Sequence, residues 1–235
     1  MQRLDKILSD AGVASRKELK SMIRAGRIAV GGTVCRDETQ KFDEQTADVT
    51  LDGAPVEKLH PVLLMMHKPA GLLTAAEDPR ARTVMELVPE KYRRFGVMPV
   101  GRLDKETEGL LLLTNDGELA HRIISPKYGI VKKYYAEHEG EAAEADVRAF
   151  QEGLTLADGL HCLPARLEPM GAGRSYVYVQ EGKYHQVRRM MASRGLTVTY
   201  LRRETEAHLS LGDLPKGAVR ELDIVAFRDE LAKML

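Results

Sequence analysis

Long apolar runs and paired cysteines are both missing from this chain of 235 residues. No stretch approaches the roughly 20 consecutive apolar residues that a membrane-spanning helix needs. The N-terminal MQRLDKILSDAG lacks the apolar centre and the small-residue cleavage site of a signal peptide. The two cysteines, Cys35 and Cys162, are too few for a disulfide scaffold and form no C-x-x-C pair. The sequence therefore predicts a cytoplasmic protein with no membrane partner.

The sequence motifs of the common cofactors and metals are absent as well. There is no G-x-x-x-x-G-K-[ST] phosphate loop, no G-x-G-x-x-G that opens a helix, no H-E-x-x-H zinc spacing and no G-x-S-x-G nucleophile elbow. If the chain is an enzyme, it must work with carboxylates, tyrosines and cations. We expect it to use no cofactor and no metal.

Net charge is also absent, because 35 Lys and Arg residues balance 35 Asp and Glu residues. The distribution of these charges is more informative. Residues 1–36 hold eight basic and three acidic residues, and residues 182–203 hold six basic residues and no acidic one. Phosphate attraction acts within a Debye length of about 8–10 Å, so such local patches can bind a polyanion. Ordinary solvated helix faces are the alternative.

The first sixty residues are predicted to form two helices and a hairpin. RLDKILSDAG has apolar residues at helical spacing and stops at Gly12. The following S-R-K-E, which starts at Ser15, is a capping box for a second helix, with Gly26 as the residue that ends it. Gly31-Gly32 between two β-prone runs indicates a tight hairpin.

The phrases RLDKILSDAGVASRKE and IRAGRIAVGG resemble the small RNA-binding domain named after ribosomal protein S-four, over about residues 2–50. The resemblance implies a small α/β RNA-binding domain, which we expect to cover residues 1–58. It also implies contacts to structured RNA from five basic residues: Arg16, Lys17, Lys20, Arg24 and Arg27. A helical-hairpin domain with ordinary surface charge is the alternative.

Residues 58–61 (KLHP) are expected to form a short linker, and a second domain is expected over residues 61–235. Strands are predicted at VLLMMHKPAG, FGVMPVGRLD, GLLLLTNDG and several later runs, and helices at ELAHRIIS, AEADVRAFQEG and HQVRRMMASRG. Strands outnumber helices and often follow one another directly. This order favours an α+β fold with a mixed, mostly antiparallel sheet and flanking helices.

Three segments of the second domain offer suitable chemistry. GRLDKETEGLLLLTNDG places Asp104 in a loop between apolar strands, where flanking cations keep a carboxylate ionised, although a turn former is the alternative. VKKYYAEHEG places Lys132 and Tyr134 on one face of a strand, although a half-buried tyrosine beside a lysine that reaches solvent is the alternative. In EGKYHQVRRMMASRG, Arg188 is a candidate partner for a buried carboxylate. Three further cations there are candidates for phosphate contacts: Lys183, Arg189 and Arg194.

Taken in order, KPAG, GRLDKETEGLLLLTNDG, KKYY, EGKYHQVRRM and LRR closely resemble the pseudouridine synthases of the RsuA type, and the resemblance covers nearly the whole chain. It implies that Asp104 is the catalytic aspartate and that Arg188 pairs with it. It also implies that Tyr134 stacks on the target base and helps to remove a proton. It places Arg102 near the flipped nucleotide, and Lys132, Leu201 and Arg203 on other motif positions that support the pocket. We expect five basic residues of this domain to contact RNA: Arg102, Lys132, Lys183, Arg189 and Arg203.

The activity implied by this resemblance is the isomerisation of a uridine in ribosomal RNA. Asp104 could attack the anomeric carbon of the ribose or promote elimination, and the residues leave both routes open. We expect a monomer whose partner is ribosomal RNA or a pre-ribosomal particle, and a small-subunit target, because no long basic tail follows the catalytic domain. The alternatives are a large-subunit target, a non-catalytic ribosome-assembly factor and a hydrolase with paired carboxylates.

One stretch departs from the pattern of the family. After LRR the family usually continues with an apolar residue and a glycine, whereas this chain has ETEAH, with Glu206 and Ala207 at those two positions. The sequence therefore leaves open the conformation of this loop and any substrate contact that it makes.

Overall fold

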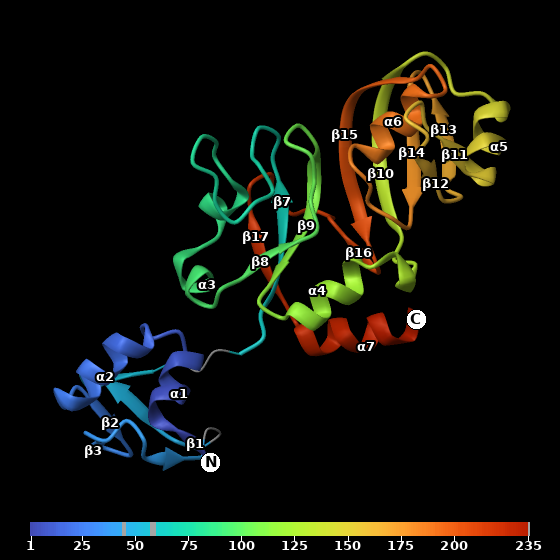
Figure 1. Cartoon of the computed structure of the whole chain (residues 1–235). Coiled ribbons are helices and arrows are strands. Elements are labelled where there is room, and N and C mark those ends of the chain that lie inside the picture. The colour runs from blue at the N-terminus through green and yellow to red at the C-terminus, as the bar shows by residue number, and fades with distance from the viewer. Residues whose placement is uncertain (44–45, 57–59, 235) are drawn as a thin grey trace. The chain divides into compact units, whose positions relative to one another are not determined.

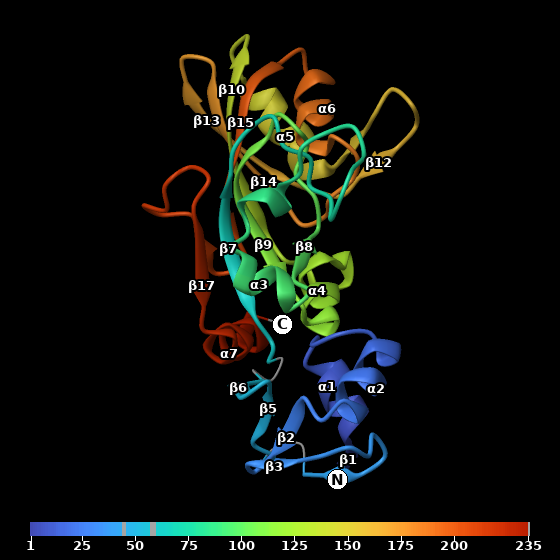
Figure 2. The same cartoon turned by 90° about the vertical axis from the view of Figure 1, so that its left-hand side faces the viewer.

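The structure is a computed structural model that describes residues 1–43, 46–56 and 60–234. It divides into two compact units, Met1–His60 and Pro61–Leu235 (Figures 1 and 2). Both units combine helices with strands, so the predicted α+β class is confirmed. Of the linker predicted at 58–61, residues 58 and 59 lie outside the described residues. Within the described part, no helix is both long and apolar enough to cross a membrane.

The N-terminal unit packs two helices against short strands. Ser15 caps α2 (Arg16–Arg24), and the Glu18 carboxylate accepts a hydrogen bond of 3.0 Å from the Ser15 N–H, so the predicted capping box is confirmed. Gly26 follows with a φ of 75°, as its predicted place after the helix requires. The remaining elements are α1 (Leu4–Asp10), β1 (Gln2–Arg3), β2 (Ile28–Val30), β3 (Thr33–Val34), β4 (Lys41–Phe42), β5 (Val49–Leu51) and β6 (Ala54–Pro55).

A nine-stranded sheet forms the centre of the second unit, in the order β13-β14-β10-β15-β9-β7-β17, with β16 beside β15 and β8 beside β9. Along this order every pairing is antiparallel except that of β15 with β9, which confirms the mostly antiparallel sheet. The strands are β7 (Leu63–Lys68), β8 (Met98–Val100), β9 (Glu108–Thr114), β10 (Lys132–Glu139), β13 (Arg166–Gly171), β14 (Arg174–Val179), β15 (Thr197–Glu206), β16 (Leu209–Ser210) and β17 (Val219–Leu222). A separate small hairpin consists of β11 (Leu154–Thr155) and β12 (His161–Cys162).

Strands β7 and β9 separate two apolar cores and are buried along their whole length. Their side chains alternate between the cores: Leu64 and Leu111 lie in one, and Leu63 and Leu112 lie in the other. The two strands therefore form a rigid centre. In Figure 2, α5 and α6 lie on one side of the strands β10, β13 and β15. The helices are α3 (Glu90–Arg94), α4 (Gly117–Ile124), α5 (Glu144–Glu152), α6 (Gln186–Ala192) and α7 (Ile224–Met234), with 3-10 turns at Val84–Leu87 and Pro126–Tyr128.

The last residue of β7, Lys68, ties down the loop 101–107 that precedes β9. Its side chain is fully buried. Its ammonium donates three hydrogen bonds of 2.9–3.0 Å to backbone oxygens, those of Pro69, Lys105 and Thr107. Burial lowers the pKa of Lys68 to about 8, against the attraction of nearby carboxylates. Because two of these bonds end on the loop, its backbone is fixed from the side of β7.

The pKa of Lys68 predicts how the stability of the protein changes with pH. In the unfolded chain the pKa returns to 10.5, so between pH 8 and 10.5 the unfolded state binds more protons than the folded state. The contribution of this group to the free energy of unfolding therefore increases as the pH rises. We expect the stability of the wild-type protein relative to Lys68→Met to increase by about 2 kcal/mol between pH 8 and 10. Urea unfolding followed by circular dichroism measures this difference, and a decrease over the same interval would contradict the assignment.

The turn between β15 and β16 contains a strained alanine. Glu206 pairs with Leu209, which leaves Ala207 and His208 as a two-residue turn. Ala207 has a φ of 55°, a left-handed conformation that costs an L-residue about 1–2 kcal/mol. This alanine stands where the family usually has a glycine, so the chain adopts the left-handed turn without the residue best suited to it.

Replacing Ala207 by Gly should stabilise the protein. The strain disappears, while the larger backbone entropy of glycine in the unfolded chain cancels about 0.5–1 kcal/mol of the gain. We expect the free energy of unfolding to rise by about 0.5–1 kcal/mol, measured by urea unfolding. Ala149→Gly in the middle of α5 is the control and should lower it by about 1 kcal/mol. If Ala207→Gly destabilised the protein as Ala149→Gly does, the strain would not exist.

Candidate active site

A small pocket lies where the loop before β9 meets β10, β15 and the turn that enters α6. Its volume is about 50 Å³, which is room for one or two water molecules at about 30 Å³ each. The lining residues are Arg102, Leu103, Asp104, Thr107, Tyr134, Val179, Glu181, Gly182, Lys183, His185, Gln186, Val187 and Leu201.

Asp104 combines a fixed backbone with an accessible carboxylate. Leu103 is buried immediately before it, and the Thr107 N–H donates a 3.0 Å hydrogen bond to the Asp104 carbonyl oxygen, which closes the turn. The Asp104 side chain is 30% exposed, and its Oδ1 lies 3.6 Å from Nε2 of His185. This is the arrangement that a reactive carboxylate needs, because it can meet a substrate atom at a defined position.

His185, which the sequence analysis did not select, is the residue that the structure brings to Asp104. It precedes α6 in a left-handed conformation with a φ of 48°. Its ring stacks on that of Tyr184 at a centroid distance of 3.9 Å and an interplanar angle of 14°. The signal that could have found it was the H-Q pair in EGKYHQVRRM, which stands beside Arg188 in the same motif. Strained backbone at a pocket is a reason to look for function there.

Arg188 does not pair with Asp104 in this structure, which corrects the expected ion pair. Its Nη1 donates a 3.1 Å hydrogen bond to the backbone oxygen of Val198 in β15. Among the described residues, the side chain in ion-pair distance of Asp104 is His185. The physical reason is the start of α6: His185 precedes the helix in a left-handed conformation, so its side chain leaves the helical spacing and reaches Asp104, whereas Arg188 inside the helix reaches β15.

Tyr134 lines the pocket from β10 and is 9% exposed. Burial raises the pKa of its hydroxyl, the charge of Arg203 lowers it, and the charges of Glu206 and Asp104 raise it further. The net direction is upward, so Tyr134 is a neutral phenol at physiological pH. It can therefore donate a hydrogen bond or relay a proton, but it does not act as a standing phenolate base.

Lys132 and Arg203, both of which we expected to contact RNA, are buried in the structure. Lys132 is 6% exposed and donates a 3.3 Å hydrogen bond to the backbone oxygen of Ile130. Arg203 is 2% exposed and donates to the backbone oxygen of Leu110 at 2.7 Å. Side chains enclosed in this way cannot reach a phosphate on the surface. Both belong to the inner face of the sheet that also carries Tyr134.

The other predicted cations near the pocket lie on the surface, and several already have acidic partners. Arg102 is exposed at the pocket. Lys183 lies 2.8 Å from Glu181, and Arg189 lies 2.6 Å from Asp158. Arg194 of the same segment lies 2.8 Å from Asp146 at the start of α5. A phosphate that binds to these cations must therefore compete with, or add to, existing ion pairs.

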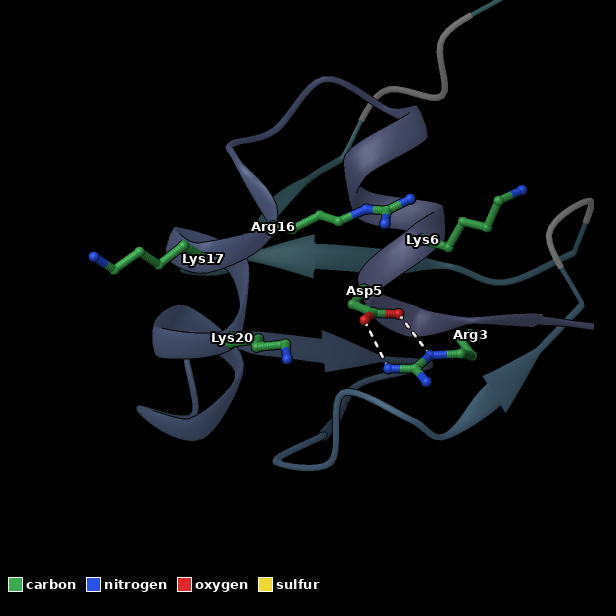
Figure 3. Close-up of a pocket in the computed structure, with 6 residues that line it drawn as sticks. All are labelled: Arg3, Asp5, Lys6, Arg16, Lys17 and Lys20. Atoms are coloured by element: carbon green, nitrogen blue, oxygen red, sulfur yellow. Dashed lines mark hydrogen bonds and ion pairs between the residues drawn. The ribbon is translucent and has the colours of Figure 1, made fainter.

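The N-terminal unit has its own basic cavity of about 600 Å³. Its lining residues are Arg3, Asp5, Lys6, Arg16, Lys17 and Lys20 (Figure 3). The one carboxylate, that of Asp5, is bound by Arg3 at 2.8 Å, and the hydrogen bond from Arg3 lowers its pKa. The cavity is therefore positively charged. Figure 3 shows Lys17 pointing away from the other five side chains.

Arg24 and Arg27, also predicted to bind RNA, do not line this cavity. Arg24 lies 3.0 Å from Glu38, and Arg27 lies 2.5 Å from Asp52. Both arginines are exposed and already paired. The structure thus divides the predicted RNA-binding residues of this unit into three that line a basic cavity and two that form surface ion pairs.

Comparison with known proteins assigns both units to families. Residues 62–193 match the family described as RNA pseudouridylate synthase, and residues 2–45 match the S4 domain, the S-four-like domain of the sequence analysis. The uncharacterized RNA pseudouridine synthase YtzG of Bacillus subtilis is 40% identical over 225 residues, which cover 94% of this chain and 94% of the relative.

Two further comparisons extend over nearly the whole length of the chain. Ribosomal large subunit pseudouridine synthase B of Bacillus subtilis is 35% identical and is matched over 94% of this chain and 92% of its own. A crystal structure of a pseudouridylate synthase superposes with a TM-score of 0.67 at 26% identity, covering all of both chains. The sequence motifs, the fold and these relatives agree, and the chain therefore belongs to the RNA pseudouridylate synthase family, as an RNA pseudouridine synthase with an S4 domain before its catalytic domain.

Proposed function

We propose that this enzyme converts a uridine of ribosomal RNA into pseudouridine, with Asp104 as the reactive carboxylate. The observation that carries the proposal is the accessible Asp104 carboxylate, held on a fixed loop, in one pocket with Tyr134. Uridine and pseudouridine are isomers, so the reaction needs no redox partner and no group donor. The residues of the pocket are the kinds that such a reaction requires.

The role of Asp104 follows from the bonds that change. The nitrogen–ribose bond of uridine breaks, the uracil turns over, and its carbon 5 bonds to the anomeric carbon of the ribose. Asp104 either attacks the anomeric carbon or promotes elimination from the ribose, and its position serves both routes. The loop that Lys68 holds keeps the carboxylate at a constant distance from the bound nucleotide, which is how positioning lowers a barrier.

Tyr134 serves the target base in two ways. Its ring can stack on the uracil, and base–aromatic stacking contributes about 1–3 kcal/mol. A proton must also leave carbon 5 after the new bond has formed. Because Tyr134 is a neutral phenol, it accepts this proton only while it passes its own hydroxyl proton onward, to water or to a neighbouring group.

We assign different roles to Arg188 in α6 and to the two residues before this helix, Tyr184 and His185. Arg188 fixes α6 against β15 through Val198 and acts on the pocket through that contact. His185 stands beside the Asp104 carboxylate. Tyr184, which is 74% exposed and stacked on His185, offers a surface on which a base next to the target can stack.

Base flipping costs free energy, which contacts between the protein and the rest of the RNA must offset. A paired or stacked uridine reaches the pocket only when it is extruded, at a cost of a few kcal/mol. Phosphate contacts offset this cost, and we assign the main ones to Arg16, Lys17 and Lys20 of the basic cavity. Contacts from Arg102, Lys183 and Arg189 add to them near the pocket.

We propose that the target lies in the large ribosomal subunit. Relatives named ribosomal large subunit pseudouridine synthase B, from Bacillus subtilis and Vibrio cholerae, are 35% and 36% identical to this chain. Their names favour a large-subunit uridine over the small-subunit target that the missing basic tail had suggested. The proposal includes a monomer in the cytoplasm that acts on ribosomal RNA, free or within a pre-ribosomal particle.

Replacement of Asp104 by Asn tests the catalytic role, because it keeps the size of the side chain and removes the carboxylate. In cells that lack this protein we expect one pseudouridine to disappear from ribosomal RNA. The intact protein should restore it, whereas Asp104→Asn should be slower by about 10⁴-fold or more and should not. Pseudouridine mapping of both ribosomal subunits provides the measurement and identifies the target.

The control for this experiment is Asp213→Asn, because the Asp213 side chain is 91% exposed on another loop. It should restore the modification fully. Restoration by Asp104→Asn would remove the catalytic role and favour an assembly factor. Loss of a small-subunit site would reject the large-subunit target and leave the chemistry intact.

The dependence of RNA binding on salt tests the basic cavity. The triple variant Arg16→Gln, Lys17→Gln, Lys20→Gln should lower the slope of log K against log salt by about 2–3, since each phosphate contact contributes about 0.7–0.9. Binding of transcribed ribosomal RNA at several salt concentrations measures the slope. The control, Arg24→Gln with Arg27→Gln, removes cations that are already paired and should change the slope by less than one. Equal slopes for the wild type and the triple variant would exclude the cavity as a phosphate site.

A further inference from the structure

Three charged side chains lie buried next to Tyr134 and take no part in the function proposed above. Lys132, Arg203 and Glu206 are 6%, 2% and 1% exposed, and we call them the buried charge cluster. Charged side chains are almost never buried to this extent unless they are paired.

A β-bulge in β15 brings the cluster together. Strands β10 and β15 lie side by side (Figure 1), with Tyr134 opposite Arg203 and Lys132 opposite Glu206. Arg203 and Glu206 are three residues apart, and strand alternation alone would point them to opposite faces of the sheet. The register shifts by one residue between the two pairs, and the extra residue, Glu204, returns Glu206 to the inner face.

Arg203 is fixed by its contacts. Its Nε donates a 2.7 Å hydrogen bond to the backbone oxygen of Leu110. Its Nη2 lies 3.0 Å from Oε2 of Glu206, an ion pair that is not aligned as a hydrogen bond. The backbone of Arg203 lies against Gly109, where an added Cβ would stand 2.2 Å from the Arg203 carbonyl oxygen. The guanidinium therefore stays in the core, and Glu206 neutralises it there.

Glu206 cannot be removed without leaving an uncompensated charge. Among the described residues, it is the carboxylate within ion-pair distance of Arg203. Burial lowers the pKa of Lys132 while the attraction of Glu206 raises it. An unpaired buried ion is strongly unfavourable, so loss of Glu206 forces Arg203 to seek another anion or water.

Tyr134 connects this cluster to the pocket. The charges of Arg203 and Glu206 act on its hydroxyl in opposite directions, and Asp104 acts on it from the pocket side. The orientation of the Tyr134 hydroxyl therefore depends on where the Arg203 guanidinium is held. If that guanidinium moves, Tyr134 loses the cation that lies opposite it on β15.

We propose that Glu206 is a positioning residue for the pseudouridine synthase reaction. It holds the Arg203 guanidinium beside Tyr134. Tyr134 thereby keeps a defined hydroxyl orientation. This inference rests on the roles proposed above for Tyr134 and Asp104.

Glu206→Gln tests the proposal, because it keeps the shape of the side chain and removes its charge. We expect the single-turnover rate of pseudouridine formation in transcribed ribosomal RNA to fall about 10- to 100-fold, since small displacements in an active site have effects of this size. The Kd for the RNA should stay within about twofold, because the cluster is buried. The expected result is thus a loss of rate without a loss of binding.

A spectroscopic measurement separates positioning from a purely structural role. Protein labelled with ¹³C at the tyrosine Cζ gives a resonance for Tyr134, which Tyr134→Phe assigns. We expect Glu206→Gln to move this resonance at neutral pH, in the absence of RNA. The signal does not depend on activity, so failure of the proposed function, seen as an active Asp104→Asn, is distinguishable from failure of this inference.

The matched control is Glu204→Gln, two residues earlier on the same strand. Glu204 forms a surface ion pair of 2.6 Å with Arg202, and its loss should change neither the rate nor the Tyr134 resonance. If Glu206→Gln does not fold, Glu206→Asp keeps the charge on a shorter side chain and should give smaller changes of the same kind. A folded variant that leaves either the rate within twofold or the Tyr134 resonance in place overturns the proposal.

Discussion

The catalytic unit depends on the close approach of β9 and β15, the parallel pairing within its nine-stranded sheet. Gly109 pairs with Arg203 there at a φ of 109°, and any Cβ at residue 109 would collide with the Arg203 backbone. The pairing is only two residue pairs long, yet it joins the part of the sheet with β9, the strand that follows the Asp104 loop, to the part with β10, which carries Tyr134. Each of the two supplies residues of the pocket, so the pocket exists only because they meet.

The pairing of β9 with β15 lies between a rigid side of the site and a more exposed side. Lys68 holds the loop of Asp104 through buried hydrogen bonds, which suits a carboxylate that must keep its position. The turn with Tyr184 and His185 is more exposed and contains a left-handed residue at the mouth of the pocket.

Sequence patterns predicted what short-range rules control. The capping box at Ser15 needs only adjacent residues, and alternation in β10 correctly put Lys132 and Tyr134 on one face. The same alternation places the side chain of Lys132 in the interior, and the expected RNA contact did not take this burial into account. The bulge at Glu204 has no local signal, so the inward turn of Glu206 could not be predicted. Likewise, which side chain lies beside Asp104 depends on the residue at which α6 begins. The motif EGKYHQVRRM alone does not reveal that residue.

The pairing of surface charges explains how a chain without net charge can bind a polyanion. On the catalytic unit, Lys183, Arg189 and Arg194 each face a carboxylate. A phosphate gains little from a cation that must first give up its partner. In the basic cavity of the N-terminal unit the one carboxylate is already bound by Arg3, and Arg16, Lys17 and Lys20 form no ion pair with another described residue. In the function proposed above, these three cations bind phosphate without that cost, and affinity belongs mainly to the S4 domain. In the catalytic unit, buried charges such as Glu206 then serve to position the residues of the pocket.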